Sequence, residues 1–211
     1  MPSHNYTVNI MINNGNKKLI SIILIDTILL CGNTEPSINP LKKIKNKKIP
    51  MFKSDKDKKL AELFLKDLED KFIEISFSNV SYIIVGGHFP ILSAGENGPN
   101  KFLIEKLMPL LHKYKVSAYF SGHDHSLQHI SHNYMNTQVE YFITGAGSSS
   151  NTSNKYINNI PKNSLKFKWP NKIELTHGGF LLVEANENRM IVNFMKADGT
   201  NLYKKTILSR E

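Results

Sequence analysis

The sequence has 211 residues, of which 40% are hydrophobic and 21% charged, with 27 Lys and Arg, 18 Asp and Glu, and a formal net charge of +9. This hydrophobic content is enough to build the core of one domain of ordinary size, and it excludes a globally disordered chain. Cys31 is the single cysteine, which excludes a scaffold held by intramolecular disulfides.

Most of the net charge comes from one segment, residues 41–59, which contains nine Lys and two Asp. The segment has no Arg, and Phe52 is its only aromatic residue. Sites for single-stranded nucleic acid combine basic side chains with aromatic ones on which bases stack. The pattern therefore predicts a solvated Lys-rich loop at 34–59 and no nucleic-acid partner.

The N-terminal region carries no recognisable targeting or membrane signal. Its first ten residues, MPSHNYTVNI, lack the charged and then apolar layout of a signal peptide. The longest apolar stretch, Ile20 to Cys31, contains Asp26 and is too short to span a bilayer. We expect no transmembrane segment, and a cytoplasmic protein if Met1 is the true start.

The first half of the chain predicts alternating strands and helices. Alternation or buried-type apolar runs predict strands at 6–12, 18–30, 80–85 and 116–120. Helical spacing predicts helices at 58–75 and 101–114. The apolar stripe of the first helix consists of Leu60, Leu63, Phe64, Leu68 and Phe72.

The second half of the chain is rich in predicted strands. They are expected at 126–132, 138–144, 179–185, 190–196 and 202–208. Residues 148–164 are polar and rich in Asn and Ser, which predicts a mobile surface loop. The order β-β-α-β-α-β followed by strands predicts a layered α/β or α+β fold.

Two of the predicted buried strands end at glycine followed by histidine. His88 follows the strand in IIVGGHFP, and His123 and His125 follow the strand in AYFSGHDHSLQ. A helix between these strands predicts a β-α-β crossover, in which parallel strands place their carboxyl ends at the same edge. We therefore expect the three imidazoles to converge on one crevice.

Converging imidazoles are typical of a catalytic metal site. Histidine is the commonest protein ligand of zinc, and three His with an open coordination position can activate a bound water. Asp124 is predicted as a ligand or as an acceptor that orients an imidazole, and Glu96 is the other acidic residue nearby. The remaining histidines are expected to be surface or packing residues, with His177 a lesser candidate: His4, His112, His129, His132 and His177.

Residues 85–130 resemble the central block of the tartrate-resistant, purple-type acid phosphatases, within the calcineurin-like metallophosphoesterases. The resemblance rests on GH-F-P, an E-x-G-P loop and GHDH in this order, and it extends to LIDTILLCGN, YFITGAGS and HGGFLLVE. It implies a calcineurin-like β-sandwich flanked by helices. It also implies that 1–211 forms a single, incomplete domain whose N-terminal part is missing.

The resemblance implies a binuclear metal centre with one Fe(III) and one Fe(II), Zn or Mn. His88 and His123 resemble ligands of the divalent metal, and His125 a ligand of the ferric ion. In such a site a metal-held hydroxide attacks the phosphorus of a phosphate monoester. The family is typically secreted or lysosomal or vacuolar, which the resemblance extends to this chain.

The sequence departs from the family at several motifs. The family's G-D-x-G, G-D-x-x-Y and G-N-H-D, which supply carboxylate, Tyr and Asn ligands, have no counterparts here. Asn97 stands where the family often has a His that helps to protonate the leaving group, and an amide is no general acid near neutral pH. The Cys that would pair with Cys31 in the family falls at Phe102. No catalytic residue is therefore predicted with certainty.

Three functions fit these observations. The first is an acid phosphatase represented by a fragment that is inactive alone and exposes an apolar sheet face or edge. The second is a non-catalytic scaffold or anchor that has lost metal ligands, and the third is a mononuclear metal-binding protein that uses the three His.

Overall fold

The computed structural model describes residues 5–12, 17–31, 52, 54–172 and 178–210. Expectations for residues 34–51 and for His4 and His177 therefore lie outside the described residues.

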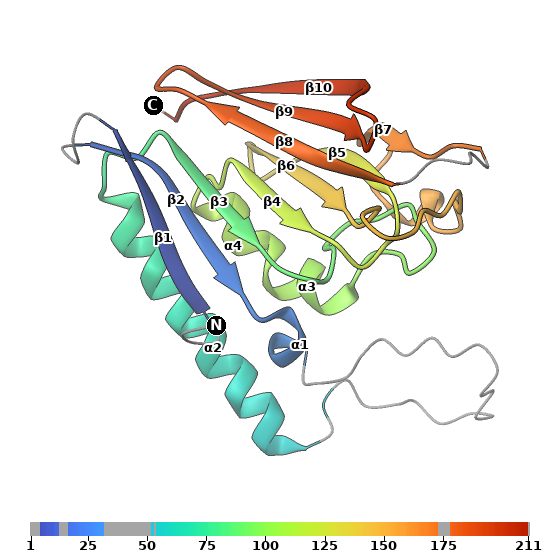
Figure 1. Ribbon diagram of the computed structural model, residues 1–211. Coiled ribbons are helices and arrows are strands. Elements are labelled where there is room, and N and C mark those ends of the chain that lie inside the picture. The colour runs from blue at the N-terminus through green and yellow to red at the C-terminus, as the bar shows by residue number, and fades with distance from the viewer. Residues whose placement is uncertain (1–4, 13–16, 32–51, 53, 173–177, 211) are drawn as a thin grey trace.

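A seven-stranded sheet, sheet A, forms the centre of the fold and has the order β1-β2-β3-β4-β6-β5-β7 (Figure 1). Strands β2, β3, β4 and β6 run parallel, while β1, β5 and β7 run antiparallel to their neighbours. The strands are β1 (Asn5–Ile12), β2 (Lys17–Ile25), β3 (Tyr82–Gly86), β4 (Ala118–Ser121), β5 (Leu127–Tyr134), β6 (Thr137–Thr144) and β7 (Leu165–Trp169). The four parallel strands bring their carboxyl ends to one edge, where open α/β sheets place ligands.

A three-stranded antiparallel sheet, sheet B, covers part of one face of sheet A, and helices cover the other face (Figure 1). Sheet B consists of β8 (Gly179–Ala185), β9 (Arg189–Lys196) and β10 (Asn201–Leu208). The helices are α1 (Thr27–Leu30), α2 (Asp55–Ser76), α3 (Lys101–Lys106) and α4 (Met108–Lys113), with a short 3-10 helix, η2 (Ile157–Asn159). The expected sandwich with flanking helices is confirmed.

Helix α2 begins inside the expected Lys-rich loop, because Ser54 caps it. The Ser54 hydroxyl accepts a hydrogen bond from the Asp57 amide, and Asp55 and Asp57 place negative charge in the first turn. The predicted apolar stripe is partly wrong, since Leu60 and Leu63 are exposed. The buried positions of α2 are Ala61, Phe64, Leu68, Phe72 and Ile75.

Two predicted elements each divide in the structure. The strand expected at 18–30 ends at Ile25, because Asp26 accepts hydrogen bonds from the Ile28 and Leu29 amides and so caps α1. The helix expected at 101–114 breaks between α3 and α4, where Pro109 lies in the first turn of α4.

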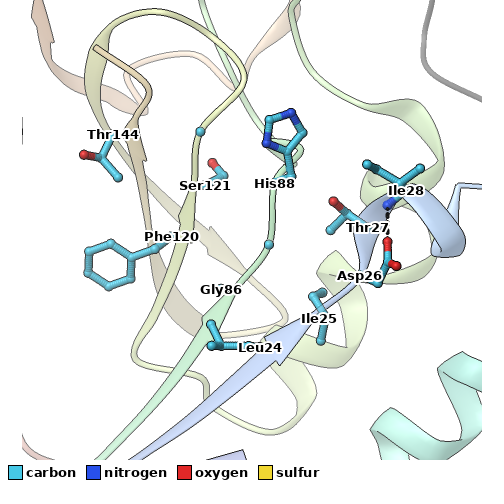
Figure 2. A pocket seen from close by; sticks show the side chains of 12 residues that line it. Leu24, Ile25, Asp26, Thr27, Ile28, Gly86, His88, Phe120, Ser121 and Thr144 are labelled. Atoms are coloured by element: carbon cyan, nitrogen blue, oxygen red, sulfur yellow. Dashed lines mark hydrogen bonds between the residues drawn. The ribbon is translucent and has the colours of Figure 1, made fainter. Parts of the chain in front are cut away.

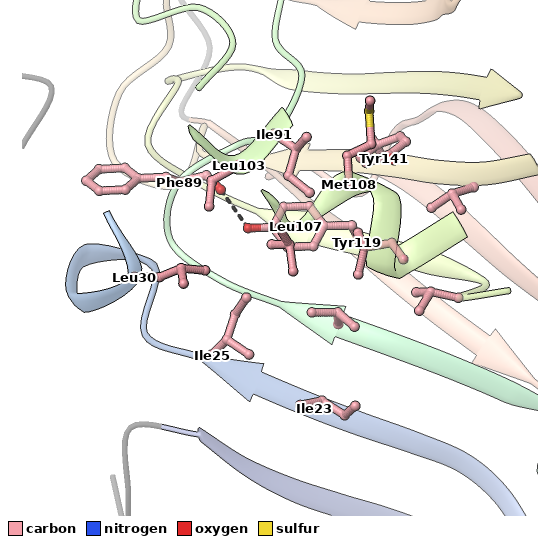
Figure 3. Packing of buried hydrophobic residues seen from close by; sticks show 14 of the residues in the cluster. Ile23, Ile25, Leu30, Phe89, Ile91, Leu103, Leu107, Met108, Tyr119 and Tyr141 are labelled. Atoms are coloured by element: carbon pink, nitrogen blue, oxygen red, sulfur yellow. Dashed lines mark hydrogen bonds between the residues drawn. The ribbon is translucent and has the colours of Figure 1, made fainter. Parts of the chain in front are cut away.

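Two hydrophobic clusters hold the three layers together. The larger cluster lies between sheet A and the helices and joins Ile23, Tyr119 and Tyr141 to Leu103 and Leu107 (Figure 3). The smaller one lies between the sheets, with Tyr82, Ile84 and Phe142 facing Val192 and Phe194. Strand β7, which the sequence analysis did not predict, contributes Trp169 to this smaller cluster.

The edge strands of the two sheets differ in charge. In the described part of the chain, β7 and β10 end their sheets on one side and carry Lys166, Lys168, Lys204 and Lys205. Strands β1 and β8 end the sheets on the other side and contain no Lys. Lysine on an edge strand opposes pairing with further strands, so only β7 and β10 have this protection.

An apolar groove lies between the two unprotected edges. Its volume is about 430 Å³, and its lining includes Ile10 of β1, Ile22 of β2 and Val183 of β8. Ile10 and Val183 are 42% and 38% exposed, so the groove is open to solvent. The expected exposed apolar face is therefore present beside β1 and β2. None of the described helices is long and apolar enough to cross a membrane.

Candidate metal centre

His88 and His123 lie where neighbouring parallel strands end. His88 follows β3 through Gly86 and Gly87, and His123 follows β4 through Gly122. The two connections are tied by a hydrogen bond from the Gly122 amide to the His88 carbonyl, 3.1 Å long. The expected β-α-β crossover is therefore present, and it brings two of the three predicted imidazoles to one edge.

The two imidazoles contact each other directly. His88 Nε2 and His123 Nδ1 are 3.2 Å apart, and the ring centroids are 5.0 Å apart. His88 is exposed and His123 is half-buried, so both rings can be reached from solvent. His123 adopts φ +66°, a left-handed conformation that is uncommon for a residue with a side chain and is often found at functional sites.

Phe89 and its neighbours fix the backbone that carries His88. The Phe89 amide donates to Thr27 Oγ1 (3.0 Å), and Tyr119 donates its hydroxyl to the Phe89 carbonyl (2.7 Å). The Phe89 ring packs edge-on against His123, with centroids 4.8 Å apart. Gly87 is required here, because a Cβ would lie 2.5 Å from Thr27 Cγ2 and 2.8 Å from the Tyr119 hydroxyl.

His88 stands at an open cleft across the ends of β2, β3 and β4 (Figure 2). The cleft has a volume of about 470 Å³, and its polar lining includes Asp26, Thr27, Ser121 and Thr144. The Asp26 carboxylate bonds the amides at the start of α1, as Figure 2 shows for Ile28. Of the two paired histidines, His88 is the one that lines this cleft.

His125 is held separately from the pair. It is exposed, and its Nδ1 lies 2.8 Å from the Ser149 hydroxyl. Its carbonyl accepts a hydrogen bond from the Asn151 amide (2.6 Å). These bonds connect His125 to the loop at 148–164. That loop is not wholly a surface loop, since it buries Ile160.

Asp124 is turned into the protein. The residue is 1% exposed, and its carboxylate accepts hydrogen bonds from the Ser93 hydroxyl and the Asn97 amide, the latter 2.8 Å long. Gln128 Nε2 donates to Ser93 Oγ (3.0 Å), and Gln128 Oε1 accepts from the Ala94 amide (2.9 Å). Asp124 thus anchors the loop at 93–97 beneath the histidines, rather than bonding an imidazole.

Asn97 and Glu96 lie on this anchored loop. Asn97 Nδ2 donates to the His123 carbonyl (3.2 Å), so Asn97 supports the backbone that carries His123. Glu96 is exposed and accepts a hydrogen bond from Asn151 Nδ2. Sequence analysis did not find Ser93, Gln128 or Thr27, because nothing in their local patterns distinguishes them from ordinary polar residues.

The described residues do not form a complete metal site. Nowhere in the described part of the chain do three His, Cys, Asp or Glu side chains cluster closely enough to hold an ion. The imidazoles of His88 and His123 supply two nitrogen donors, and a binuclear centre needs several more, including oxygen donors. The donor set seen here therefore does not fit a binuclear centre by itself.

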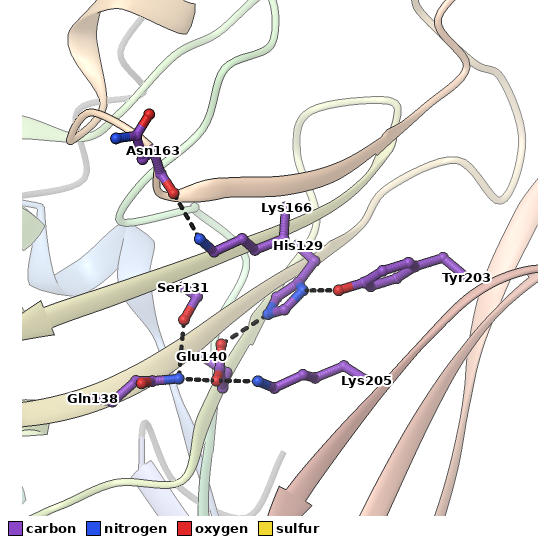
Figure 4. A network of polar contacts seen from close by, with 8 residues as sticks. All are labelled: His129, Ser131, Gln138, Glu140, Asn163, Lys166, Tyr203 and Lys205. Atoms are coloured by element: carbon purple, nitrogen blue, oxygen red, sulfur yellow. Dashed lines mark hydrogen bonds and ion pairs between the residues drawn. The ribbon is translucent and has the colours of Figure 1, made fainter.

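Another histidine, His129, is buried and has a different environment (Figure 4). Its Nε2 lies 2.7 Å from Glu140 Oε2, and its Nδ1 lies 2.9 Å from the Tyr203 hydroxyl. Lys205 and Gln138 bond the other Glu140 oxygen, at 2.9 and 2.6 Å. Burial opposes ionisation of Glu140, but these hydrogen bonds lower its pKa to about 2. His129 was expected to be a surface or packing residue, and it lies buried between the sheets.

Comparison with protein families identifies the fold. The profile of the calcineurin-like phosphoesterases matches residues 3–127. The chain belongs to the calcineurin-like phosphoesterase family. The family implies a binuclear metal centre and a phosphate ester substrate, in keeping with the position of His88 and His123 at the strand ends.

The chain is similar to acid phosphatases over nearly its whole length. It is 31% identical to human tartrate-resistant acid phosphatase type 5 over 209 residues, which are 99% of this chain and 58% of that protein. It is 32% identical to purple acid phosphatase 4 of Arabidopsis thaliana over 127 residues, 60% of this chain and 34% of that protein. The chain thus spans a little over half the length of the curated relatives that it matches along its whole length.

Two solved structures share the fold. One, described as GAP50, the anchor in the inner membrane complex of Plasmodium, matches with a TM-score of 0.67 and 21% identity, over all of this chain and 56% of that one. The other, the purple acid phosphatase PPD1 from yellow lupin seeds, matches with a TM-score of 0.56 and 13% identity, over 96% and 32% of the chains.

Proposed function

We propose that this chain is part of an acid phosphatase-type hydrolase of phosphate monoesters, in which His88, His123 and His125 contribute to a binuclear metal centre. The observation that carries the proposal is the direct contact of His88 Nε2 with His123 Nδ1 at the carboxyl ends of two parallel strands. Two imidazoles this close can turn toward one ion with small side-chain rotations.

In this proposal His88 and His123 bind the divalent metal, which is Fe, Zn or Mn. His125 binds the ferric ion through Nε2, since Ser149 bonds its Nδ1 and so fixes the ring orientation. Asp124, Glu96 and Asn97 support the ligands through the loop at 93–97. Residues 1–211 form part of one calcineurin-like domain, which is incomplete in this chain.

The remaining ligands would come from the part of the fold that the relatives have beyond this match. The acid phosphatases extend well past the aligned residues. Carboxylate and Tyr donors from that part would complete the oxygen-rich coordination that Fe(III) prefers. A secreted, lysosomal or vacuolar location follows from the same resemblance.

Metal binding by the purified chain tests the proposal directly. We expect the chain to bind one equivalent of Co²⁺ or Zn²⁺, and we expect His88→Asn and His123→Asn each to weaken binding at least tenfold. His132→Asn is the matched control, because His132 lies on β5, away from the cleft, and should change nothing. If the parent and the three variants bound the metal ion equally well, the assignment of His88 and His123 as metal ligands would be contradicted.

Turnover of p-nitrophenyl phosphate tests the catalytic part. We expect no appreciable turnover by the 211 residues alone, because the donors seen in them are too few. If the coding sequence upstream of Met1 supplies G-D-x-G, G-D-x-x-Y and G-N-H-D motifs, the longer chain should turn over substrate and lose that activity with His88→Asn. Turnover that survives this substitution would refute the proposal.

A non-catalytic anchor is the second candidate. It is motivated by the likeness to GAP50, which at 21% identity concerns the fold alone. The two candidates differ in the metal experiment, since an anchor does not require His88 and His123 to bind an ion.

A further inference from the structure

A third pocket, besides the apolar groove and the cleft at His88, lies at the opposite end of the central strands from the histidine pair. It has a volume of about 420 Å³ and is lined by residues that precede β4 and by residues of β6 and β10. Its wall at Arg210 is fixed by a hydrogen bond from the Arg210 amide to the Ser81 carbonyl (2.9 Å), just before β3. His88 and His123 follow β3 and β4, so the strands separate the two sites.

The lining of this pocket is strongly cationic. Among the described residues, it includes the cations Lys115, Lys205 and Arg210 and a single carboxylate, Glu140. That carboxylate is already engaged by His129 and Gln138 as well as by Lys205 (Figure 4). The pocket therefore keeps a net charge of two positive units from Lys115 and Arg210.

Arg210 is the residue that most requires a ligand. Its Nε is buried and has no hydrogen-bond partner in the part of the chain that the structure describes. No carboxylate among the described residues lies within ion-pair distance of it. A buried donor without a partner destabilises the fold, and the cost is larger when the group is charged. Burial also lowers the pKa of Arg210, as expected for a cation that lacks a compensating anion.

We propose that the pocket lined by Lys115, Lys205 and Arg210 binds a small phosphate oxyanion. A guanidinium presents paired donors that match two oxygens of one phosphate, and Lys115 adds an uncompensated point charge beside it. A doubly charged oxyanion balances the net charge of the lining. The site is independent of the histidine pair, and it stands whether or not the proposed phosphatase function is correct.

Titration of the whole chain with inorganic phosphate in the presence of EDTA tests the proposal, since EDTA removes metal from the histidines. We expect saturable binding by calorimetry or NMR that weakens as salt is added. A parallel titration with O-phosphoserine distinguishes the source of the phosphate. If O-phosphoserine binds more tightly than inorganic phosphate, the ligand of the site is a phosphate ester. If it binds equally or more weakly, the ligand is the free phosphate ion.

Matched variants assign the binding to this pocket. Arg210→Gln should weaken it at least tenfold, as expected for loss of a charged hydrogen-bond pair, and Lys115→Gln about threefold. Arg189→Gln and Lys204→Gln remove cations outside the pocket and should change affinity less than twofold. Because Lys115 is exposed, its variant should fold even if Arg210→Gln does not.

The double variant with His88→Asn and His123→Asn should bind phosphate as the parent does. Three results would overturn the proposal: no binding up to about 10 mM phosphate, which corresponds to a binding free energy of only about 2.7 kcal/mol; equal weakening by the control substitutions; or loss of binding in the double histidine variant.

Discussion

The buried His129 cluster and the exposed pair of His88 and His123 use the same side chain in opposite ways. His129 bonds Glu140 and Tyr203 inside the sandwich, and Glu140 in turn bonds Lys205 and Gln138. His88 and His123 contact each other, and His88 lines an open cleft. His129, whose ring nitrogens both have partners within the protein, contributes to the stability of the fold. The two contacting imidazoles of His88 and His123 are accessible to solvent and can bind a ligand.

Removing the carboxylate from the buried cluster should have the largest effect on stability. Glu140→Ala leaves His129 and Lys205 without their shared partner in a site where Glu140 is 4% exposed. Breaking a buried charged pair costs about 3–5 kcal/mol. Urea unfolding followed by circular dichroism measures this. Glu105→Ala, which removes an exposed contact with Lys101, is the control and should cost less than about 0.5 kcal/mol.

Acid should weaken the same cluster without any substitution. The pKa of Glu140 is about 2 in the folded protein and 4.5 ordinarily, so its stabilisation is complete above pH 4.5 and is lost as the pH falls toward 2. The expected loss is about 3 kcal/mol. The free energies of unfolding of the parent and of Glu140→Gln should converge as the pH falls from 4.5 toward 2. A difference between them that stays constant with pH would show that Glu140 does not titrate as described.

Substitution of Gly87, which precedes His88, should lower the stability of the fold more than substitution of the two histidines. Gly87→Ala places a methyl group against Thr27 and the Tyr119 hydroxyl, and we expect a loss of about 1–3 kcal/mol. Gly147→Ala is the control, because a Cβ there meets nothing within 4 Å. Thermal unfolding of both variants measures this, and the transition temperature should be lower for Gly87→Ala than for Gly147→Ala. Equal transition temperatures would contradict the close packing at Gly87.

The exposed rings themselves should matter least to folding. His88→Asn and His123→Asn should each change the free energy of unfolding by less than about 1 kcal/mol, because His88 is exposed, His123 is only half-buried, and Asn tolerates the left-handed backbone at His123. Urea unfolding in EDTA measures this. A loss comparable to that of Glu140→Ala would mean that the pair is structural, like His129.

Much of this arrangement could be predicted from the sequence, because local patterns set it. Apolar runs ending at Gly86 and Gly122 predicted two parallel strands, and the histidines after them were predicted to meet. The contact between His88 and His123 follows from that topology, since adjacent parallel strands end at one edge.

Contacts between segments that are distant in the chain could not be predicted from the sequence. Asp124 was expected beside the imidazoles, but its carboxylate bonds Ser93, 31 residues away in the chain. Gln128 and Thr27 act over separations of 34 and 62 residues, so no local pattern marks them. The end of β2 could have been read from Asp26, whose side chain is a good helix cap, but the apolar run around it suggested one continuous strand.

The uneven protection of the sheet edges limits how this molecule can grow by strand addition. A fibril extends strand by strand only if both edges of a sheet stay available, since each new copy must expose the surface that the next one needs. Here β1 and β8 can accept a strand, while the lysines of β7 and β10 oppose pairing at the far edges. Within each sheet, a copy that pairs at β1 or β8 therefore leaves only the lysine-bearing strand β7 or β10 at the far edge, so neither sheet extends further by adding strands there.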